Sequence, residues 1–274
     1  AIPHFVDSEM ATLGVDPARL ADYLATVAEP TAGGLRNRQT GRRIRALMPV
    51  HIFGHPVALD PLAALCDRLG LALIEDATEA LGSTYRGRPA GGFGALSVLS
   101  FNGNKIVTTG GGGAILTHDE ELGKRAKHLT TTAKRPHAWA FVHDELGYNY
   151  RLPNLNAALG CAQLERLPDF IARKRVLAAR YEQALAGVPG VSFVREPEGC
   201  QSNYWLNAIV LDPAHAAERD LVLERTNAVG IGTRPAWTLM HRLPMYASAP
   251  RMPTPVAEQI EACLINLPSS PSLA

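Results

Sequence analysis

Short apolar runs alternate with helical patterns along the first two-thirds of the chain. In the helical stretches, apolar residues such as Leu20, Leu24 and Val27 recur with the 3.6-residue period of a helix. Asp-Pro pairs at 16–17 and 60–61 predict helix starts, with aspartate as the N-cap and proline as the first helical residue. Strands that are apolar throughout and alternate with helices predict a parallel sheet covered on both faces. The predicted strands are Pro3–Val6, Ala46–Phe53, Leu71–Glu75, Ala95–Phe101 and Ala114–Thr117.

The last third of the chain has a different pattern. A long helical pattern covers 154–186, and Pro168 within it predicts a kink or a break. Glycine and proline at 187–190 end this pattern. The remainder predicts a smaller α+β unit, with strands near 191–194 and 204–211 and helices near 214–229 and 255–264.

Composition narrows the classes of protein to consider. The chain has 274 residues, 46% of them apolar, and a net charge of +1, which gives no argument for nucleic acid or an anionic membrane as partner. No apolar run approaches the roughly 20 residues that span a bilayer, and no signal peptide opens the chain. The four cysteines lie too far apart for a zinc site. We predict a cytoplasmic protein with reduced thiols, no metal site, a large domain at 1–165 and a small domain at 166–274.

Two charged residues lie at the ends of predicted strands. Asp76 ends the run at Leu71–Glu75, and Lys105 lies on a turn after the run at Ala95–Phe101. Ligands bind at the carboxyl ends of strands in such sheets. A lysine amine forms an imine with the aldehyde of pyridoxal phosphate, and a carboxylate keeps the pyridine nitrogen protonated, so that the ring accepts electrons. Either residue alone is common on protein surfaces, but the pair predicts a pyridoxal phosphate site.

Two further segments leave alternatives open. The segment Thr31–Arg45 holds five arginines and no apolar period, which predicts either a solvated loop or a loop that contacts an anion. The glycines at 110–113 predict either a tight turn before a strand or a phosphate-binding nest.

Four motifs, in this order along nearly the whole chain, resemble the DegT/DnrJ/EryC1/StrS sugar aminotransferases. They are Pro49–Pro56 (PVHIFGHP), Glu75–Gly82 (EDATEALG), Ser100–Lys105 (SFNGNK) and Gly147–Arg151 (GYNYR). The resemblance implies a mostly parallel α/β domain of the aspartate-aminotransferase fold (fold type I), a small C-terminal α+β domain, and amination of nucleotide-linked keto sugars. Asn102-Gly103-Asn104, the four glycines and the arginine-rich 37–43 are most similar to the LegC/PglE-like branch, which aminates C4 of UDP-linked 4-keto-6-deoxy sugars.

The resemblance also implies roles for single residues. Lys105 is the imine-forming lysine and proton carrier, Asp76 pairs with the pyridine nitrogen, and Ser100 binds the cofactor phosphate. Asn149 is expected to reach the phosphate in the neighbouring subunit, which implies a homodimer with shared active sites. Glu79 stands where most of the family has glutamine against the phenolic oxygen. Because the family begins well before the first residue here, we expect that the chain lacks the segment carrying the Gly-Thr turn that holds the phosphate.

Each candidate substrate contact has a structural alternative. His51 is either a site residue or a satisfied core histidine, and Arg234 and His241 are either substrate ligands or parts of a salt bridge or loop cap. Trp139 lies in a loop that either covers the sugar or packs. The predicted substrate-binding set is His51, Arg151, Arg234 and His241.

The predicted activity is a ping-pong transamination with L-glutamate as amino donor and a nucleotide sugar as acceptor. One alternative is a sugar dehydratase of the same superfamily, which has histidine in place of the lysine and is therefore disfavoured by Lys105. Another is a non-catalytic dimer partner that binds the cofactor without turnover.

Overall fold

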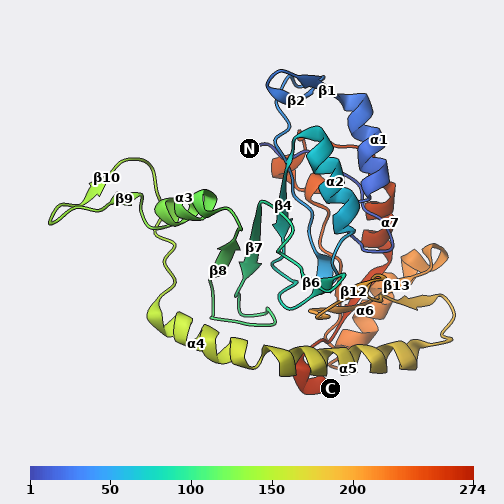
Figure 1. Ribbon diagram of the computed structural model, residues 1–274. Helices are drawn as coiled ribbons and strands as arrows, with labels where there is room; N and C mark the ends of the chain where they lie inside the picture. The colour runs from blue at the N-terminus through green and yellow to red at the C-terminus, as the bar shows by residue number, and fades with distance from the viewer.

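The computed structural model describes residues 1–274 and contains two four-stranded sheets connected through a long helix (Figure 1). The first sheet has the order β3-β4-β7-β8, with β3 at Ala46–Leu47, β4 at Ala72–Asp76, β7 at Leu96–Ser100 and β8 at Gly113–Leu116. The second has the order β11-β13-β15-β14, with β11 at Val191–Phe193, β13 at Asn207–Leu211, β15 at Leu264–Leu267 and β14 at Arg234–Pro235.

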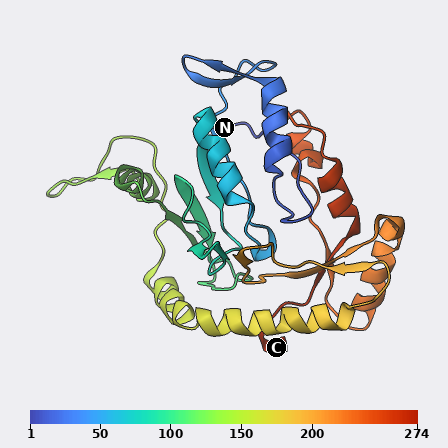
Figure 2. The same ribbon diagram turned by 45° about the vertical axis from the view of Figure 1, so that its right-hand side comes forward.

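Seven α-helices accompany the sheets. They are α1 (Pro17–Val27), α2 (Leu59–Leu69), α3 (Glu120–Thr130), α4 (Asn154–Glu165), α5 (Leu167–Leu185), α6 (Arg219–Ala228) and α7 (Pro255–Cys263). In Figure 2, α5 runs beneath both sheets. No helix is both long enough and apolar enough to cross a membrane.

Smaller elements complete the chain. Two hairpins pair β1 (Ala28–Thr31) with β2 (Gly34–Asn37) and β9 (Lys134–Arg135) with β10 (Val142–His143), and a small sheet joins β12 (Cys200–Gln201), β5 (Thr84–Tyr85) and β6 (Arg88–Pro89). The 3-10 helices are η1 (Ile52–Gly54), η2 (Pro213–Glu218), η3 (Met240–Arg242), η4 (Pro244–Tyr246) and η5 (Pro271–Leu273).

The helix signals in the sequence are mostly confirmed. The Asp16 side chain accepts hydrogen bonds from the backbone N–H groups of Ala18 and Arg19, as an N-cap does. The helical pattern over 154–186 breaks between α4 and α5, directly before Pro168. The prediction for Asp60 was wrong, because α2 begins at Leu59 and Asp60 lies in its first turn, where a carboxylate still favours the helix dipole.

The prediction of a parallel sheet holds for three strands only. β3, β4 and β7 are parallel, whereas β8 is antiparallel to β7. The connection from β7 to β8 contains no helix that could form a crossover, and Gly110 and Gly112 lie in it at positive φ. These positions fit the tight-turn interpretation, in which Gly113 already belongs to β8.

Other boundaries differ from the prediction. The run at Pro3–Val6 forms only an isolated bridge from Phe5 to Arg251, and the run at 46–53 is a strand over two residues only. Pro49 carries no N–H for a ladder, and η1 follows it. The strand predicted from Tyr204 begins at Asn207, and the helix predicted at 214–229 divides into η2 and α6.

The first residues of the chain pack against its end. Asp7 is buried, and its carboxylate accepts hydrogen bonds from the backbone of Val256 and Ala257 at the start of α7. The predicted division at 165/166 falls at the junction of α4 and α5, and remains a prediction.

The main core lies between α2 and the first sheet. Leu59, Leu62 and Leu65 of α2 pack with Leu73 of β4. All four cysteines are free, as predicted; Cys66, Cys200 and Cys263 are buried and Cys161 is exposed.

One core residue makes the fold sensitive to acid. His55 is buried, and neither of its ring nitrogens has a hydrogen-bond partner. Burial lowers the pKa of His55 from 6.5 to about 4, and the negative charge of Glu196 only partly opposes this. The unfolded chain therefore binds a proton between pH 6.5 and 4 that the folded chain does not, so stability falls as the pH drops through this window.

We expect His55→Phe, which keeps a ring against Tyr204, to remove this sensitivity. Between pH 7 and pH 4, the free energy of unfolding of the wild type should fall by about 3 kcal/mol more than that of the variant. Urea unfolding at a series of pH values measures this difference. Parallel curves for the two proteins would contradict the assignment.

Candidate functional site

The carboxyl ends of β4 and β7 bring three predicted site residues to one edge of the sheet. Asp76 is the last residue of β4 and pairs in register with Val98 of β7. Ser100, two residues further along, ends β7. Lys105 follows on a turn whose backbone hydrogen bond runs from the Lys105 N–H to the carbonyl of Asn102.

Glu79 connects this edge to the lysine. Lys105 Nζ lies 3.4 Å from Glu79 Oε1, and the N–H of Phe53 donates to Glu79 Oε2 at 2.8 Å. Burial raises the pKa of the Glu79 carboxyl, and the opposing effects of Lys105 and the Phe53 N–H do not cancel the rise. Phe53 itself has a φ of 58°, a strained backbone for a bulky residue, and this conformation accompanies its N–H contact with the carboxylate.

His51 does not face this edge. Its side chain is fully buried, with Nε2 3.1 Å from Glu75 Oε2 and Nδ1 accepting from the Val57 N–H at 3.2 Å. Because both ring nitrogens are engaged inside the protein, the position does not support substrate binding by His51. It fits the core-histidine alternative instead.

Glu75 forms the centre of that buried network, a role that the sequence analysis missed. Besides His51, its carboxylate accepts from the N–H groups of Gly91, Phe93 and Gly94. Burial raises the pKa of Glu75, but these four hydrogen bonds outweigh burial and lower it below the ordinary value. A buried, ionised Glu75 thus holds the loop between β6 and β7 against β4.

The sequence analysis also missed the segment 202–205, which comes from the second half of the chain. Trp205 is buried, and its ring centroid lies 3.9 Å from Lys105 Nζ. Asn203 donates from Nδ2 to the carbonyls of Glu79 and Leu81. No periodic pattern marks these residues, because they lie in a loop before β13; only the presence of a rare tryptophan was available as a signal.

Arg234 and His241 lie on the second half of the chain, without contacts to Lys105. Arg234 is exposed on β14, and only its Nη1 is engaged, by Asn227 and by the carbonyl of Thr233. His241 is nearly buried beside Phe5, with Nε2 3.7 Å from Glu258. The structure therefore leaves Arg234 free to bind an anion and gives His241 the environment of a packed residue.

Asn149 and Arg151 lie on an exposed segment beside the end of α3. The Arg151 guanidinium donates to Asn149 Oδ1 at 2.9 Å and to the carbonyl of Thr131 at 3.1 Å. An isolated bridge pairs Thr131 with Asn149. This segment makes no contact with Lys105, Asp76 or Ser100 of the same chain.

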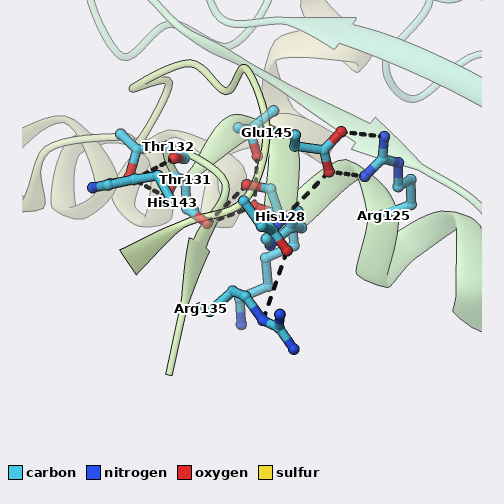
Figure 3. A network of polar contacts seen from close by, with 10 residues as sticks. Arg125, His128, Thr131, Thr132, Arg135, His143 and Glu145 are labelled. Carbon is cyan, nitrogen blue, oxygen red and sulfur yellow. Dashed lines mark hydrogen bonds and ion pairs between the residues drawn. The ribbon is translucent and has the colours of Figure 1, made fainter. Parts of the chain in front are cut away.

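A polar network anchors the β9–β10 hairpin next to this segment (Figure 3). Arg125 forms two bonds with Glu145, and His128 Nε2 lies 2.8 Å from Asp144 Oδ1. His128, Asp144 and Glu145 are close enough together for a metal ion, but Arg125 and Arg135 already pair with the two carboxylates. The network is therefore a salt-bridge cluster that holds the base of the hairpin.

The arginine-rich segment lies away from the site. Arg36 and Arg38 pair with Glu29 within the β1–β2 hairpin. Arg45 directly precedes β3, at the amino ends of the parallel strands, whereas Asp76 and Ser100 lie at the carboxyl ends. This topology is against the anion-contacting interpretation and fits a solvated hairpin.

A cleft of about 750 Å³ lies between β7, β8, α3 and the segment 150–153. Arg151 lines it, but Lys105 and Asp76 do not. The sheet edge that carries Lys105 and Asp76 is therefore separate from this cleft.

The donor set at the ends of β4 and β7 fits pyridoxal phosphate. It comprises an amine, a carboxylate and a hydroxyl, contributed by Lys105, Asp76 and Ser100. Only Oδ1 of Asp76 accepts a protein hydrogen bond, which leaves Oδ2 for a protonated ring nitrogen. The Lys105 side chain is only 12% exposed, so its amine is shielded from bulk water.

Comparison with known proteins identifies the family of the chain. A model of the DegT/DnrJ/EryC1/StrS aminotransferase family matches residues 1–274. GDP-perosamine synthase of Escherichia coli O157:H7 is 38% identical over 232 residues, which cover 85% of this chain and 62% of the relative. A dTDP-3-amino-3,4,6-trideoxy-alpha-D-glucose transaminase of Streptomyces venezuelae is 35% identical over 236 residues, covering 84% and 60%. The chain thus spans about three-fifths of the length of these relatives.

The fold has solved counterparts. The crystal structure of the aminotransferase TlmJ from Streptoalloteichus hindustanus superposes with a TM-score of 0.87 and 30% identity, covering 100% of this chain and 69% of that one. This likeness confirms the predicted fold type I of pyridoxal phosphate-dependent enzymes. The chain belongs to the DegT/DnrJ/EryC1/StrS aminotransferase family.

Proposed function

We propose that this protein transfers an amino group from L-glutamate to a nucleotide-linked 4-keto-6-deoxy sugar, with pyridoxal phosphate as cofactor. The observation that carries the proposal is the meeting of Lys105, Asp76 and Ser100 at one sheet edge in a member of an aminotransferase family. The product would serve surface polysaccharide, nonulosonic acid or bacillosamine-type sugar synthesis.

Each residue has a distinct task in this proposal. When bound, pyridoxal phosphate supplies an aldehyde that condenses with amines and a ring that takes up an electron pair. In each half-reaction Lys105 Nζ would move a proton between the substrate carbon and C4′ of the cofactor, which requires an approach to about 3 Å. Asp76 keeps the ring nitrogen protonated through its free Oδ2, and Ser100 donates its hydroxyl to the phosphate. Glu79, whose pKa is raised by burial, keeps its carboxyl beside the lysine amine.

We further propose a homodimer in which Asn149 serves the partner's cofactor. Support comes from exposed large apolar residues on the segments that precede and follow Asn149 in the sequence, since exposed apolar surface marks interfaces. Trp139 and Phe141 lie at the tip of the projecting hairpin, 85% and 81% exposed, and Leu155 at the start of α4 is 87% exposed. Asn149 forms its hydrogen bonds with Arg151 and none with Lys105, Asp76 or Ser100 of its own chain, as expected of a residue that acts in the partner.

The proposal also covers which nucleotide the sugar substrate carries. The LegC/PglE-like resemblance favours UDP, whereas the names of the two relatives above contain GDP and dTDP. All three share a diphosphate, so the binding groups must be local cations, because the net charge of +1 supplies no general attraction. Arg234 is our candidate, since its guanidinium is exposed and only one of its nitrogens is engaged.

We expect UDP to protect the holoenzyme against thermal unfolding, by an amount that grows with ligand concentration and reaches about 2.7 kcal/mol at a hundredfold excess over Kd. Arg234→Ala should raise the KM for the nucleotide sugar about tenfold or more and leave the KM for glutamate unchanged, because a lost hydrogen bond to a charged group has that size. Thermal melts and steady-state kinetics with UDP-4-keto-6-deoxy-N-acetylglucosamine measure the two effects.

Arg42→Ala is the matched control. Arg42 is exposed, forms no ion pair and lies beyond β2, so its loss removes the same charge without touching the proposed site. Protection by GDP or dTDP but not by UDP would show that the substrate carries one of these nucleotides instead of UDP. Turnover of free keto acids with no response to any nucleotide sugar would contradict the substrate class.

A further inference from the structure

The amine of Lys105 has two neighbours, one acidic and one aromatic. Nζ lies 3.4 Å from Glu79 Oε1 and 3.9 Å from the centroid of the Trp205 ring. Trp205 follows Lys105 by one hundred residues and belongs to the loop before β13. The electron-rich face of an indole attracts a cation at this separation, most strongly where water is excluded. The Lys105 side chain is only 12% exposed, which meets that condition.

Every polar atom of Trp205 forms a hydrogen bond, which limits the movement of its indole ring. Its Nε1–H donates to the carbonyl of Asn104, directly before Lys105, at 2.7 Å. Its backbone N–H donates to Asn203 Oδ1 at 2.7 Å, and its carbonyl accepts from Lys174 Nζ at 3.0 Å. The ring also stacks on Trp237, with centroids 6.4 Å apart and planes 16° apart. The ring therefore has little freedom to move away from the lysine.

The same loop is fastened to the turn that carries Glu79. Asn203 donates to the carbonyls of Glu79 and Leu81, and its backbone N–H donates to Ser83 Oγ. Gly54 faces Asn203 so closely that a Cβ there would lie 1.9 Å from Asn203 Oδ1. One loop thus holds both the aromatic and the acidic neighbour of Lys105 in place.

We propose that Trp205 is the positioning residue for Lys105, with its indole face confining the protonated amine beside Glu79 and its N–H fixing the backbone at Asn104. This inference rests on the proposed function, in which Lys105 carries a proton between two carbon atoms. A proton carrier must keep its nitrogen in one place in both of its protonation states, and a rigid ring on one side limits the rotamers of the lysine. The ring attracts the ammonium form, so the proton taken from the substrate remains on Nζ until it is returned.

Replacement of tryptophan by ring-fluorinated tryptophans tests the electronic part without changing shape. Fluorine withdraws electrons from the ring face and weakens its attraction for a cation, while the Nε1–H bond to Asn104 remains. The chain has three tryptophans, and Lys105 contacts only Trp205 among them. The readout is acetylation of Lys105 by acetic anhydride, relative to the exposed Lys124, in the full protein freed of cofactor and measured by peptide mass.

We expect the relative acetylation rate of Lys105 to rise with each added fluorine, by roughly threefold overall, because a weaker cation–π attraction frees the reactive amine. A rate that does not change across the series would overturn the proposal. This labelling does not need turnover. An acetylation rate that depends on fluorine, in a protein without transaminase activity, would refute the proposed function and leave the positioning role of Trp205 intact. An acetylation rate that does not depend on fluorine, in an active transaminase, would refute the positioning role and leave the proposed function intact.

Substitution tests the positional part. Trp205→Leu should enlarge the kinetic isotope effect seen with glutamate deuterated at Cα, because a displaced lysine makes proton transfer slower relative to the other steps. It should also lower kcat by about a hundredfold, with the KM for glutamate unchanged. Phe170→Leu is the control, since Phe170 also faces a cation, Arg166 on the neighbouring turn, but belongs to α5 and not to the Trp205 loop. Equal isotope effects in Trp205→Leu and wild type would contradict the proposal. If Trp205→Leu fails to fold, the acetylation rates of the fluorinated proteins test the proposal on their own.

Discussion

Lys105→Arg is expected to abolish transamination. A guanidinium keeps the positive charge that faces Glu79 and the Trp205 ring, so the fold and the local electrostatics should remain. It stays protonated at neutral pH and therefore can neither condense with an aldehyde nor carry a proton. Proton transfer alone is worth about 10²- to 10⁴-fold, and we expect the loss of kcat to reach at least that range.

The measurement is the rate of the half-reaction with glutamate, followed by visible absorbance. Lys124→Arg on the exposed side of α3 is the control and should behave as wild type. Near wild-type turnover by Lys105→Arg would show that another residue holds the cofactor.

Mixing two inactive variants is expected to restore activity. If Asn149 serves the partner's cofactor, Lys105→Ala and Asn149→Ala chains together form a mixed dimer with one complete site. With random pairing, about a quarter of the wild-type activity should return, because half of the dimers are mixed and each has one intact site of two. Activity of exchanged mixtures, with the oligomeric state followed by sedimentation, measures this.

A second mixture provides the control. Lys105→Ala and Asp76→Ala remove two residues that the proposal assigns to the same chain's site, so every site in their mixed dimer lacks one of them. We expect no recovery there. Recovery in both mixtures, or a fully active monomer of the wild type, is incompatible with a shared site.

The sequence predicted the parts of the fold that local chemistry determines. The Asp16 cap, the break before Pro168 and the glycine turn before β8 all depend on residues within a few positions of each other. Asp76 was found for a related reason: it ends an apolar strand, and the carboxyl ends of parallel strands lie at one edge, whereas Ser100 was expected only from the resemblance to the family.

What the sequence could not predict depends on contacts between distant segments. Trp205 reaches Lys105 only because Asn203 ties its loop to the Glu79 turn, and no spacing rule records such a contact. His51 has the same chemistry in a core as in a site, and only its bonds to Glu75 and Val57 distinguish the two. The antiparallel direction of β8 depends on its pairing with β7, which a pattern of apolar runs does not record.

The most direct test of the proposed function follows the nitrogen atom. Wild-type protein with pyridoxal phosphate, L-glutamate labelled with ¹⁵N and a nucleotide-linked 4-keto-6-deoxy sugar should give a nucleotide-linked amino sugar that carries the label, as measured by mass spectrometry. Lys105→Arg in the same mixture should give none. Label that appears only in amino acids formed from free keto acids, with UDP-, GDP- and dTDP-linked keto sugars all unchanged, would contradict the account.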